Sequence, residues 1–161
     1  MPVVVLIDTN VWVSAFINPH GYPAKLKAAW TQHRFEAVIS VALLDELAEV
    51  LARPRIFTRY RLDPGEISEF LRLLAARALK VTPTGGLRVC RDPDDNVVLE
   101  TALLGHASYA VSRDDDIKRD RDLVAQMEAR GIKVLSVQQF VDLLAEGRLH
   151  AHKYPIGSEG N

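Results

Sequence analysis

The feature that most constrains the fold is the alternation of short apolar runs with segments of helical periodicity. The first run, Val3 to Ile7, is rich in β-branched residues and is followed at once by Asp8. A run of this length and composition indicates a parallel strand that is buried on both faces. The expected strands are residues 3–7, 36–40, 79–81, 109–111 and 132–135. Strands that alternate with helices predict an α/β fold, a three-layer sandwich with a mainly parallel central sheet.

The expected helices lie between these strands, and several of them carry start or stop residues. Ser40 precedes a segment with apolar residues at helical spacing, and Pro54 ends that helix. Another helix begins at Asp63-Pro64, and an aspartate at 94 or 95 starts the helix that runs to about Gly105. The stretch from residue 112 to residue 121 is expected to be a charged turn.

The length and composition bound the class of protein. The 161 residues predict one compact domain at 1–145 and a polar tail at 146–161. The net charge of −1 excludes a strongly basic nucleic-acid-binding domain, although an acidic site could offset a basic rim. The single cysteine excludes an internal disulfide and a cysteine-rich zinc site. Without a signal peptide or an apolar run near the ~18 residues of a membrane span, we expect a cytoplasmic protein with no membrane contact.

Acidic residues stand at four places that carry candidate chemistry. Asp8 ends the first strand and Asp114 follows the strand at 109–111, so both belong to the same edge of a parallel sheet. Glu46 lies on the helix after the second strand, and Asp95 opens a later helix. Each has an ordinary interpretation: the aspartates serve as helix caps or solvated turn residues, and Glu46 as a surface residue.

The combination of the four places favours a metal site. Carboxylates gathered at one sheet edge repel one another, and a cation that joins them lowers the cost. Hard divalent cations prefer oxygen ligands, whereas the four places contain no histidine, which argues against zinc. A metal held in this way can activate a water molecule and neutralise the charge that grows on phosphorus.

Four short motifs, in order along the chain, resemble the motifs of the PIN-domain family. They are residues 5–11 (VLIDTNV), 40–47 (SVALLDEL), 95–102 (DNVVLETA) and 111–116 (VSRDDD). The resemblance runs from Val3 to about Leu144. Within the family, the chain is most similar to the VapC-like toxin components of bacterial and archaeal toxin–antitoxin pairs.

This resemblance implies an endoribonuclease that depends on Mg²⁺ or Mn²⁺, in which activated water attacks an RNA phosphodiester in line. It also implies an antitoxin protein as a partner and a homodimer. The implied metal-binding and catalytic residues are Asp8, Asp95 and Asp114, with Glu46 holding a second metal or orienting the water, and with Asp116 as a supporting acid that also holds metal. Thr9, Asn10 and Ser112 are the implied hydrogen-bond donors that fix these carboxylates.

A basic stretch is a second candidate site. Arg53, Arg55, Arg59 and Arg61 occur with no acid between Leu51 and Leu62. These arginines either contact RNA phosphates near the acidic site or belong to a solvated loop and short helix.

Three alternatives to the ribonuclease remain open. The first is a flap-endonuclease-like nuclease that acts on DNA. The second is a non-catalytic PIN scaffold, against which the retention of all four acidic positions counts. The third is a Mg²⁺-binding signalling module of the receiver type, which also ends a strand with aspartate. That module normally needs a lysine near its last strand, and here Lys133 precedes the strand instead.

Overall fold

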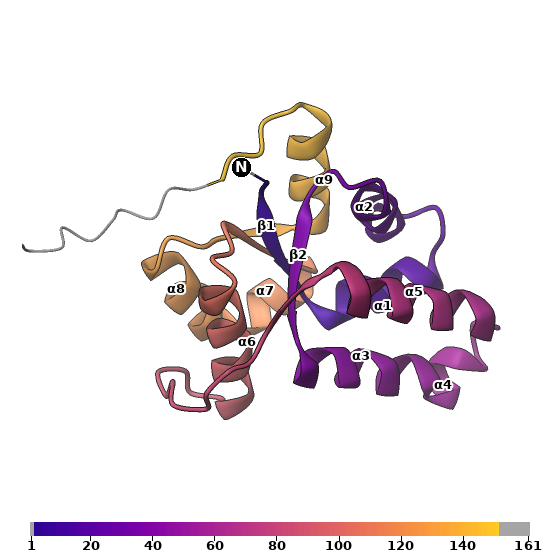
Figure 1. The fold of residues 1–161 in the computed structure, drawn as a ribbon, viewed down its shortest axis with the longest axis horizontal. Coiled ribbons are helices and arrows are strands. Elements are labelled where there is room, and N and C mark those ends of the chain that lie inside the picture. The colour runs from indigo at the N-terminus through magenta and orange to yellow at the C-terminus, as the bar shows by residue number, and fades with distance from the viewer. Residues whose placement is uncertain (1, 152–161) are drawn as a thin grey trace, which may run out of the picture.

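A computed structural model describes residues 2–151, so most of the predicted tail, residues 152–161, lies outside the described residues. A single five-stranded sheet organises the chain, and all of its strands are parallel (Figure 1). In spatial order the strands are β3 (Leu79–Val81), β2 (Glu36–Ser40), β1 (Val4–Ile7), β4 (Tyr109–Ser112) and β5 (Lys133–Ser136). The α/β prediction is confirmed, with a sheet that is parallel throughout.

Helices cover both faces of the sheet and form the two outer layers (Figure 1). One layer contains α1 (Thr9–Ile17), α2 (Tyr22–Thr31), α3 (Val41–Ala52), α5 (Pro64–Arg77) and α9 (Val137–Ala145). The other layer contains α6 (Pro93–Leu104) and α8 (Arg121–Ala129). Among the described residues, no helix is long and apolar enough to cross a membrane.

The alternating directions of strand side chains explain the two cores. Val5 and Ile7 point into the larger core with α1 and α9, whereas Leu6 between them belongs to the smaller core under α6 and α8. In the larger core the rings of Trp12 and Phe70 lie 5.1 Å apart, centroid to centroid. Both faces of β1 are therefore buried, as its continuous apolar run predicts.

Helix starts and stops follow the sequence signals. The Ser40 side chain accepts a hydrogen bond from the Leu43 N–H at 3.3 Å and caps α3, which ends at Ala52 before Pro54. A short helix, α4 (Pro54–Phe57), follows directly. The ends of α3 are therefore explained by local residues.

The charged stretch after β4 is where the predicted secondary structure is wrong. The expected turn at 112–121 contains a short helix, α7 (Asp114–Arg119). Three aspartates stand in its first turn and Lys118 and Arg119 stand in its last, an order that favours a helix because it opposes the helix dipole.

The order of the strands places a crevice at the carboxyl edge of the sheet. From β1 the chain moves outward to β2 and β3, and it then returns to the other side of β1 to form β4 and β5. Ligands of parallel sheets bind where the order reverses in this way, between β1 and β4. Receiver modules have the order 2-1-3-4-5, so the topology excludes the signalling-module alternative.

Candidate active site

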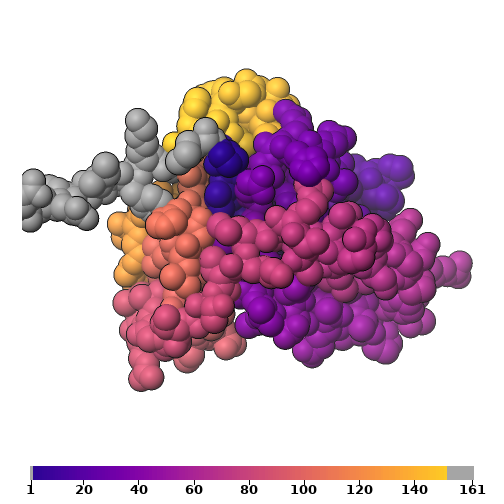
Figure 2. Space-filling model, viewed as in Figure 1, coloured from indigo at the N-terminus to yellow at the C-terminus, as the bar shows by residue number. Residues whose placement is uncertain are grey.

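A cavity of about 520 Å³ opens at the carboxyl ends of β1 and β4. It is bounded by α1, α3, α6 and α7, and the space-filling view shows a notch between the α3 and α6 sides of the molecule (Figure 2). Seven carboxylates line it: Asp8, Glu46, Asp92, Asp94, Asp95, Asp116 and Asp120. The acids predicted at the end of β1, on α3 and at the start of α6 therefore meet in one cavity.

Asp8 occupies the centre of this edge, where β1 ends and α1 begins. Its Oδ1 accepts the N–H of Asn10 at 3.3 Å and its Oδ2 accepts the Ser112 hydroxyl at 3.3 Å. Burial raises the pKa of Asp8 to about 6, repulsion from Asp116 adds to the rise, and the two hydrogen bonds oppose it. Asp8 is thus both the cap of α1 and a carboxyl that ionises with difficulty.

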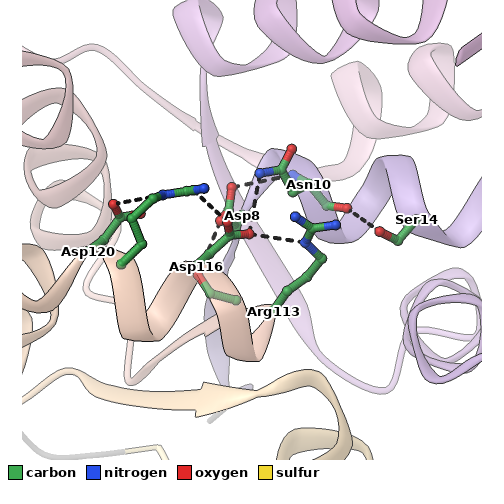
Figure 3. A network of polar contacts seen from close by, with 8 residues as sticks. Asp8, Asn10, Ser14, Arg113, Asp116 and Asp120 are labelled. Atoms are coloured by element: carbon green, nitrogen blue, oxygen red, sulfur yellow. Dashed lines mark hydrogen bonds and ion pairs between the residues drawn. The ribbon is translucent and has the colours of Figure 1, made fainter. Parts of the chain in front are cut away.

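Asp116 is the buried acid of the site, and it lies beside Asp8 (Figure 3). Its Oδ2 accepts hydrogen bonds from Asn10 Nδ2 at 3.3 Å and Arg113 Nε at 3.2 Å. Its Oδ1 accepts a hydrogen bond from Arg119 Nη2 at 2.5 Å. Burial alone would raise the pKa of Asp116, but these donors and the arginine charges hold it below the usual value. Asp116 is therefore ionised beside an Asp8 that resists ionisation.

Asp95 faces the same cavity from the first turn of α6. Burial raises its pKa to about 6, and repulsion from Asp120, Asp92 and other nearby acids adds to the effect. Asp92 caps α6 by accepting the Asp94 N–H at 2.9 Å, and Asp94 is exposed. Of the two aspartates considered for this position, Asp95 is therefore the half-buried one and Asp94 the exposed one.

The loop before α6 is attached to that helix by two side chains. Asn96 Oδ1 accepts the N–H groups of Val89 at 3.0 Å and Cys90 at 2.8 Å. The buried Glu100, one turn further along, accepts the N–H and the hydroxyl of Thr84, both at 2.6 Å. The hydroxyl and N–H of Thr84 lower the pKa of Glu100, so this carboxylate is a structural anchor and not a cavity acid. These bonds fix the segment that leads into Asp95.

Glu46 reaches the cavity from α3, on the side opposite α6. Its Oε2 lies 3.5 Å from the Thr9 hydroxyl, and the Glu46 side chain is exposed. Thr9, Asn10 and Ser112 therefore each contact a cavity acid: Thr9 contacts Glu46, Asn10 contacts Asp8 and Asp116, and Ser112 contacts Asp8.

Asp114 and the basic stretch stand apart from this arrangement. Asp114 is exposed at the first position of α7 and does not line the cavity. The arginines of the basic stretch, Arg53, Arg55, Arg59 and Arg61, lie at and beyond the far end of α3, and none of them lines the cavity. The guanidinium of Arg53 instead pairs with Glu49 at 3.2 Å on the same helix.

Two residues of the cavity were not singled out from the sequence, Asp120 and Arg119. Asp120 follows Asp116 by four residues, so a helical α7 puts both on one face and turns Asp114 away. Arg119 Nε lies 3.5 Å from Asp120 Oδ1. The four-residue spacing of Asp116 and Asp120 could have indicated that both face the cavity, but only if the segment had been predicted as a helix.

The donor chemistry of the cavity fits a hard divalent cation. Its lining, among the described residues, supplies carboxylate oxygens without histidine or cysteine. Burial first, and repulsion between neighbouring acids second, raise the pKa values of Asp8 and Asp95, and a bound cation would offset both effects. Within residues 2–151, however, no three such side chains converge closely enough to form a metal site. Binding would require carboxylates such as Asp8, Asp95 and Asp116 to approach one another.

The raised pKa values of Asp8 and Asp95 predict that the metal-free protein becomes more stable as the pH falls from about 7 to about 5. Folded Asp8 and Asp95 take up protons near pH 6, whereas the ordinary value is 3.8, so the folded state binds more protons between these values. In EDTA, the free energy of unfolding should therefore rise by about 2 kcal/mol from about pH 7 to about pH 5, with the contribution of Asp95 reduced because solvent screens its partly exposed carboxyl group. Urea unfolding along this range measures it. A free energy that stays level or falls as the pH decreases would be inconsistent with the two raised values.

A parallel α/β sheet with an acid-lined cavity at its switch point defines a class of protein that is suited to metal-assisted chemistry on phosphate esters. A sequence model described as PIN domain matches residues 4–116, and the chain belongs to the PIN-domain family. The chain is also 27% identical over 139 residues to an uncharacterized protein of the archaeon Methanocaldococcus jannaschii. That match covers 86% of this chain and 89% of the relative. PIN domains are generally nucleases and typically use divalent metal ions.

Proposed function

We propose that the protein is an endoribonuclease that depends on Mg²⁺ or Mn²⁺ and that it is the toxin of a toxin–antitoxin pair. The observation that carries the proposal is the meeting of Asp8, Asp95, Asp116 and Glu46 in one open cavity, with the pKa of Asp8 and of Asp95 raised to about 6. The choice of RNA over DNA rests on the resemblance of the four motifs to those of the VapC-like group.

The proposed metal ligands are the acids lining the cavity that the resemblance to the PIN-domain motifs also implies. Asp8, Asp95 and Asp116 hold the first cation, and Glu46 holds a second cation or orients the attacking water. When bound, Mg²⁺ or Mn²⁺ supplies an activated water and neutralises the charge that grows on the phosphorus. Asp114, which is exposed and outside the cavity, is left with no direct role in this proposal.

The polar residues of the chain prepare these carboxylates for the reaction. Ser112 and the N–H of Asn10 each donate to one oxygen of Asp8, which fixes the orientation of the carboxyl group. Asn10 links the two acids, because its backbone N–H donates to Asp8 and its side-chain amide donates to Asp116, and Ser14 holds Asn10 by donating to its carbonyl at 2.8 Å (Figure 3). Such supporting hydrogen bonds set the geometry and basicity of metal ligands.

Matched oligonucleotides test the proposal. Single-stranded RNA and DNA of one sequence, and a structured RNA, are incubated with the protein in Mg²⁺, in Mn²⁺ and in EDTA. We expect RNA to be cut in either metal and left intact in EDTA. Cleavage of DNA alone would support the flap-endonuclease-like alternative, and no cleavage of either polymer would support the non-catalytic scaffold.

The toxin assignment has its own test. A neighbouring reading frame that encodes a small DNA-binding protein should yield a partner that co-purifies with this chain and blocks its cleavage of RNA. A homodimer and a cytoplasmic location belong to the same proposal. Size-exclusion chromatography with light scattering measures the dimer, and a chain that is monomeric at all accessible concentrations would contradict it.

A further inference from the structure

One side chain of the cavity carries the opposite charge to all the other ionisable residues that line it. Among the described residues that line the cavity, Arg119 is the only cation, against seven carboxylates. It stands at the end of α7, and its side chain is 65% exposed although it contacts Asp116 and Asp120. A nucleic acid that enters this cavity brings further negative charge, so a cation in the wall of the cavity is, among the described lining residues, the one side chain that would attract it.

The partners of Asp116 show which contacts would remain if Arg119 left it. Asp116 is 1% exposed, and its Oδ2 is held by both Asn10 and Arg113. Its Oδ1 accepts the hydrogen bond from Arg119. If Arg119 turns away, the buried carboxylate keeps two donors on one oxygen, and the other oxygen is released toward the cavity.

Arg113 is not equivalent to Arg119, although both pair with the same carboxylate. Arg113 is 45% exposed, does not line the cavity, and shares Oδ2 with the Asn10 amide. Its position suits a fixed partner of Asp116. Arg119 instead combines a long exposed side chain, a place in the cavity wall and a fork of donors that matches a phosphate as well as a carboxylate.

We propose that Arg119 is a substrate-binding residue: in the free protein it neutralises Asp116 and Asp120, and on binding it transfers to a phosphate of single-stranded RNA. The inference rests on the proposed function, because it takes RNA as the substrate of this cavity. Arg119 would thus bind two kinds of anion in turn, first the carboxylates of Asp116 and Asp120 and then a phosphate. The exchange also releases Oδ1 of Asp116, so Arg119 competes with a divalent cation for that oxygen.

Two binding measurements on Arg119→Gln test the proposal, neither of which requires turnover. The first is the binding of a fluorescent single-stranded RNA, by anisotropy in Ca²⁺ and in EDTA, over a series of salt concentrations. We expect affinity to fall roughly tenfold. The slope of log K against log salt should decrease in size by about 0.7, the loss of one phosphate contact on a single strand. The second is calorimetric titration with Mn²⁺ alone, which should bind to Arg119→Gln severalfold more tightly than to the wild-type protein.

Lys118→Gln is the matched control, because Lys118 is exposed on the same helix and its replacement removes the same charge. It should change neither binding constant appreciably. Equal losses of RNA affinity in the two variants, an unchanged salt slope in Arg119→Gln, or no RNA binding by the wild-type protein would each overturn the proposal. Binding of DNA but not RNA that depends on Arg119 would overturn the assignment to RNA.

The binding and cleavage results together distinguish a failure of this inference from a failure of the proposed function. If wild-type protein binds RNA through Arg119 but does not cut it in Mg²⁺ or Mn²⁺, the substrate-binding role stands and the nuclease proposal fails. If the protein cuts RNA and Arg119→Gln binds RNA as tightly as Lys118→Gln does, the nuclease proposal stands and the role of Arg119 fails.

Discussion

Replacing Asp8 by asparagine should reduce RNA cleavage more than about 100-fold and, in EDTA at neutral pH, make the protein more stable. The amide lacks the anionic oxygen that a hard cation prefers. It also removes a charge that burial and Asp116 disfavour, since the pKa of Asp8 is raised to about 6. Asparagine caps helices as well as aspartate does, so α1 keeps its cap.

The expected gain is about 1–2 kcal/mol in the free energy of unfolding, which for a chain of this length raises the melting temperature by roughly 2–8 °C. Melting curves with and without Mn²⁺ measure both the stability of the metal-free protein and the stabilisation by the metal. The wild-type protein should gain stability from the metal by linkage, whereas Asp8→Asn should start higher and respond less. An active Asp8→Asn protein with a wild-type response to Mn²⁺ would show that Asp8 serves only as a cap.

Asp116→Asn should also abolish cleavage, but it should lower stability instead of raising it. Asp116 is buried and ionised, and Arg113 and Arg119 contact its two oxygens, so its negative charge is favourable in the folded protein. Both arginines are substantially exposed, which limits the loss to about 1–2 kcal/mol, or roughly 2–8 °C in melting temperature. Two neighbouring acids of one cavity are therefore expected to respond in opposite directions to the same chemical change.

Asp114→Asn is the matched control for this variant. Asp114 lies two residues away on the same short helix, but it is exposed and outside the cavity. We expect its replacement to leave stability nearly unchanged and to affect cleavage far less than Asp116→Asn does. If Asp114→Asn is inactive and Asp116→Asn still cleaves RNA, Asp114 and not Asp116 is the metal ligand.

The strand ends could be predicted from the sequence because their causes are local. The β-branched run before Asp8 and the run at Glu36–Ser40 are short, apolar and bounded by polar residues, and both form strands at the expected places. Parallel pairing then follows from the helices between them, which brings Asp8 and the end of β4 to the same edge. The convergence of Asp8, Glu46 and Asp95 in one cavity follows from that topology.

The details of α7 could not be predicted, because they depend on a secondary structure that the charge pattern hides. Five of the six residues of α7, DDDIKR, are charged, and such a run is typical of a solvated turn as well as of a short helix. Only a helix puts Asp116 and Asp120 on one face and Asp114 on another. The pairing of Arg119 with Asp116 depends further on the burial of Asp116, which comes from the packing of α7 against β5 and α8.

If the protein hydrolyses RNA with water as the nucleophile, as proposed, the ends of the cleavage products will show it. RNA cut by the wild-type protein in Mn²⁺ should carry no 2′,3′-cyclic phosphate, because the 2′-hydroxyl takes no part in the reaction. The same RNA should stay intact in EDTA or with Asp8→Asn. Products that end in a 2′,3′-cyclic phosphate, or that form equally well in EDTA, would rule out metal-dependent hydrolysis by water.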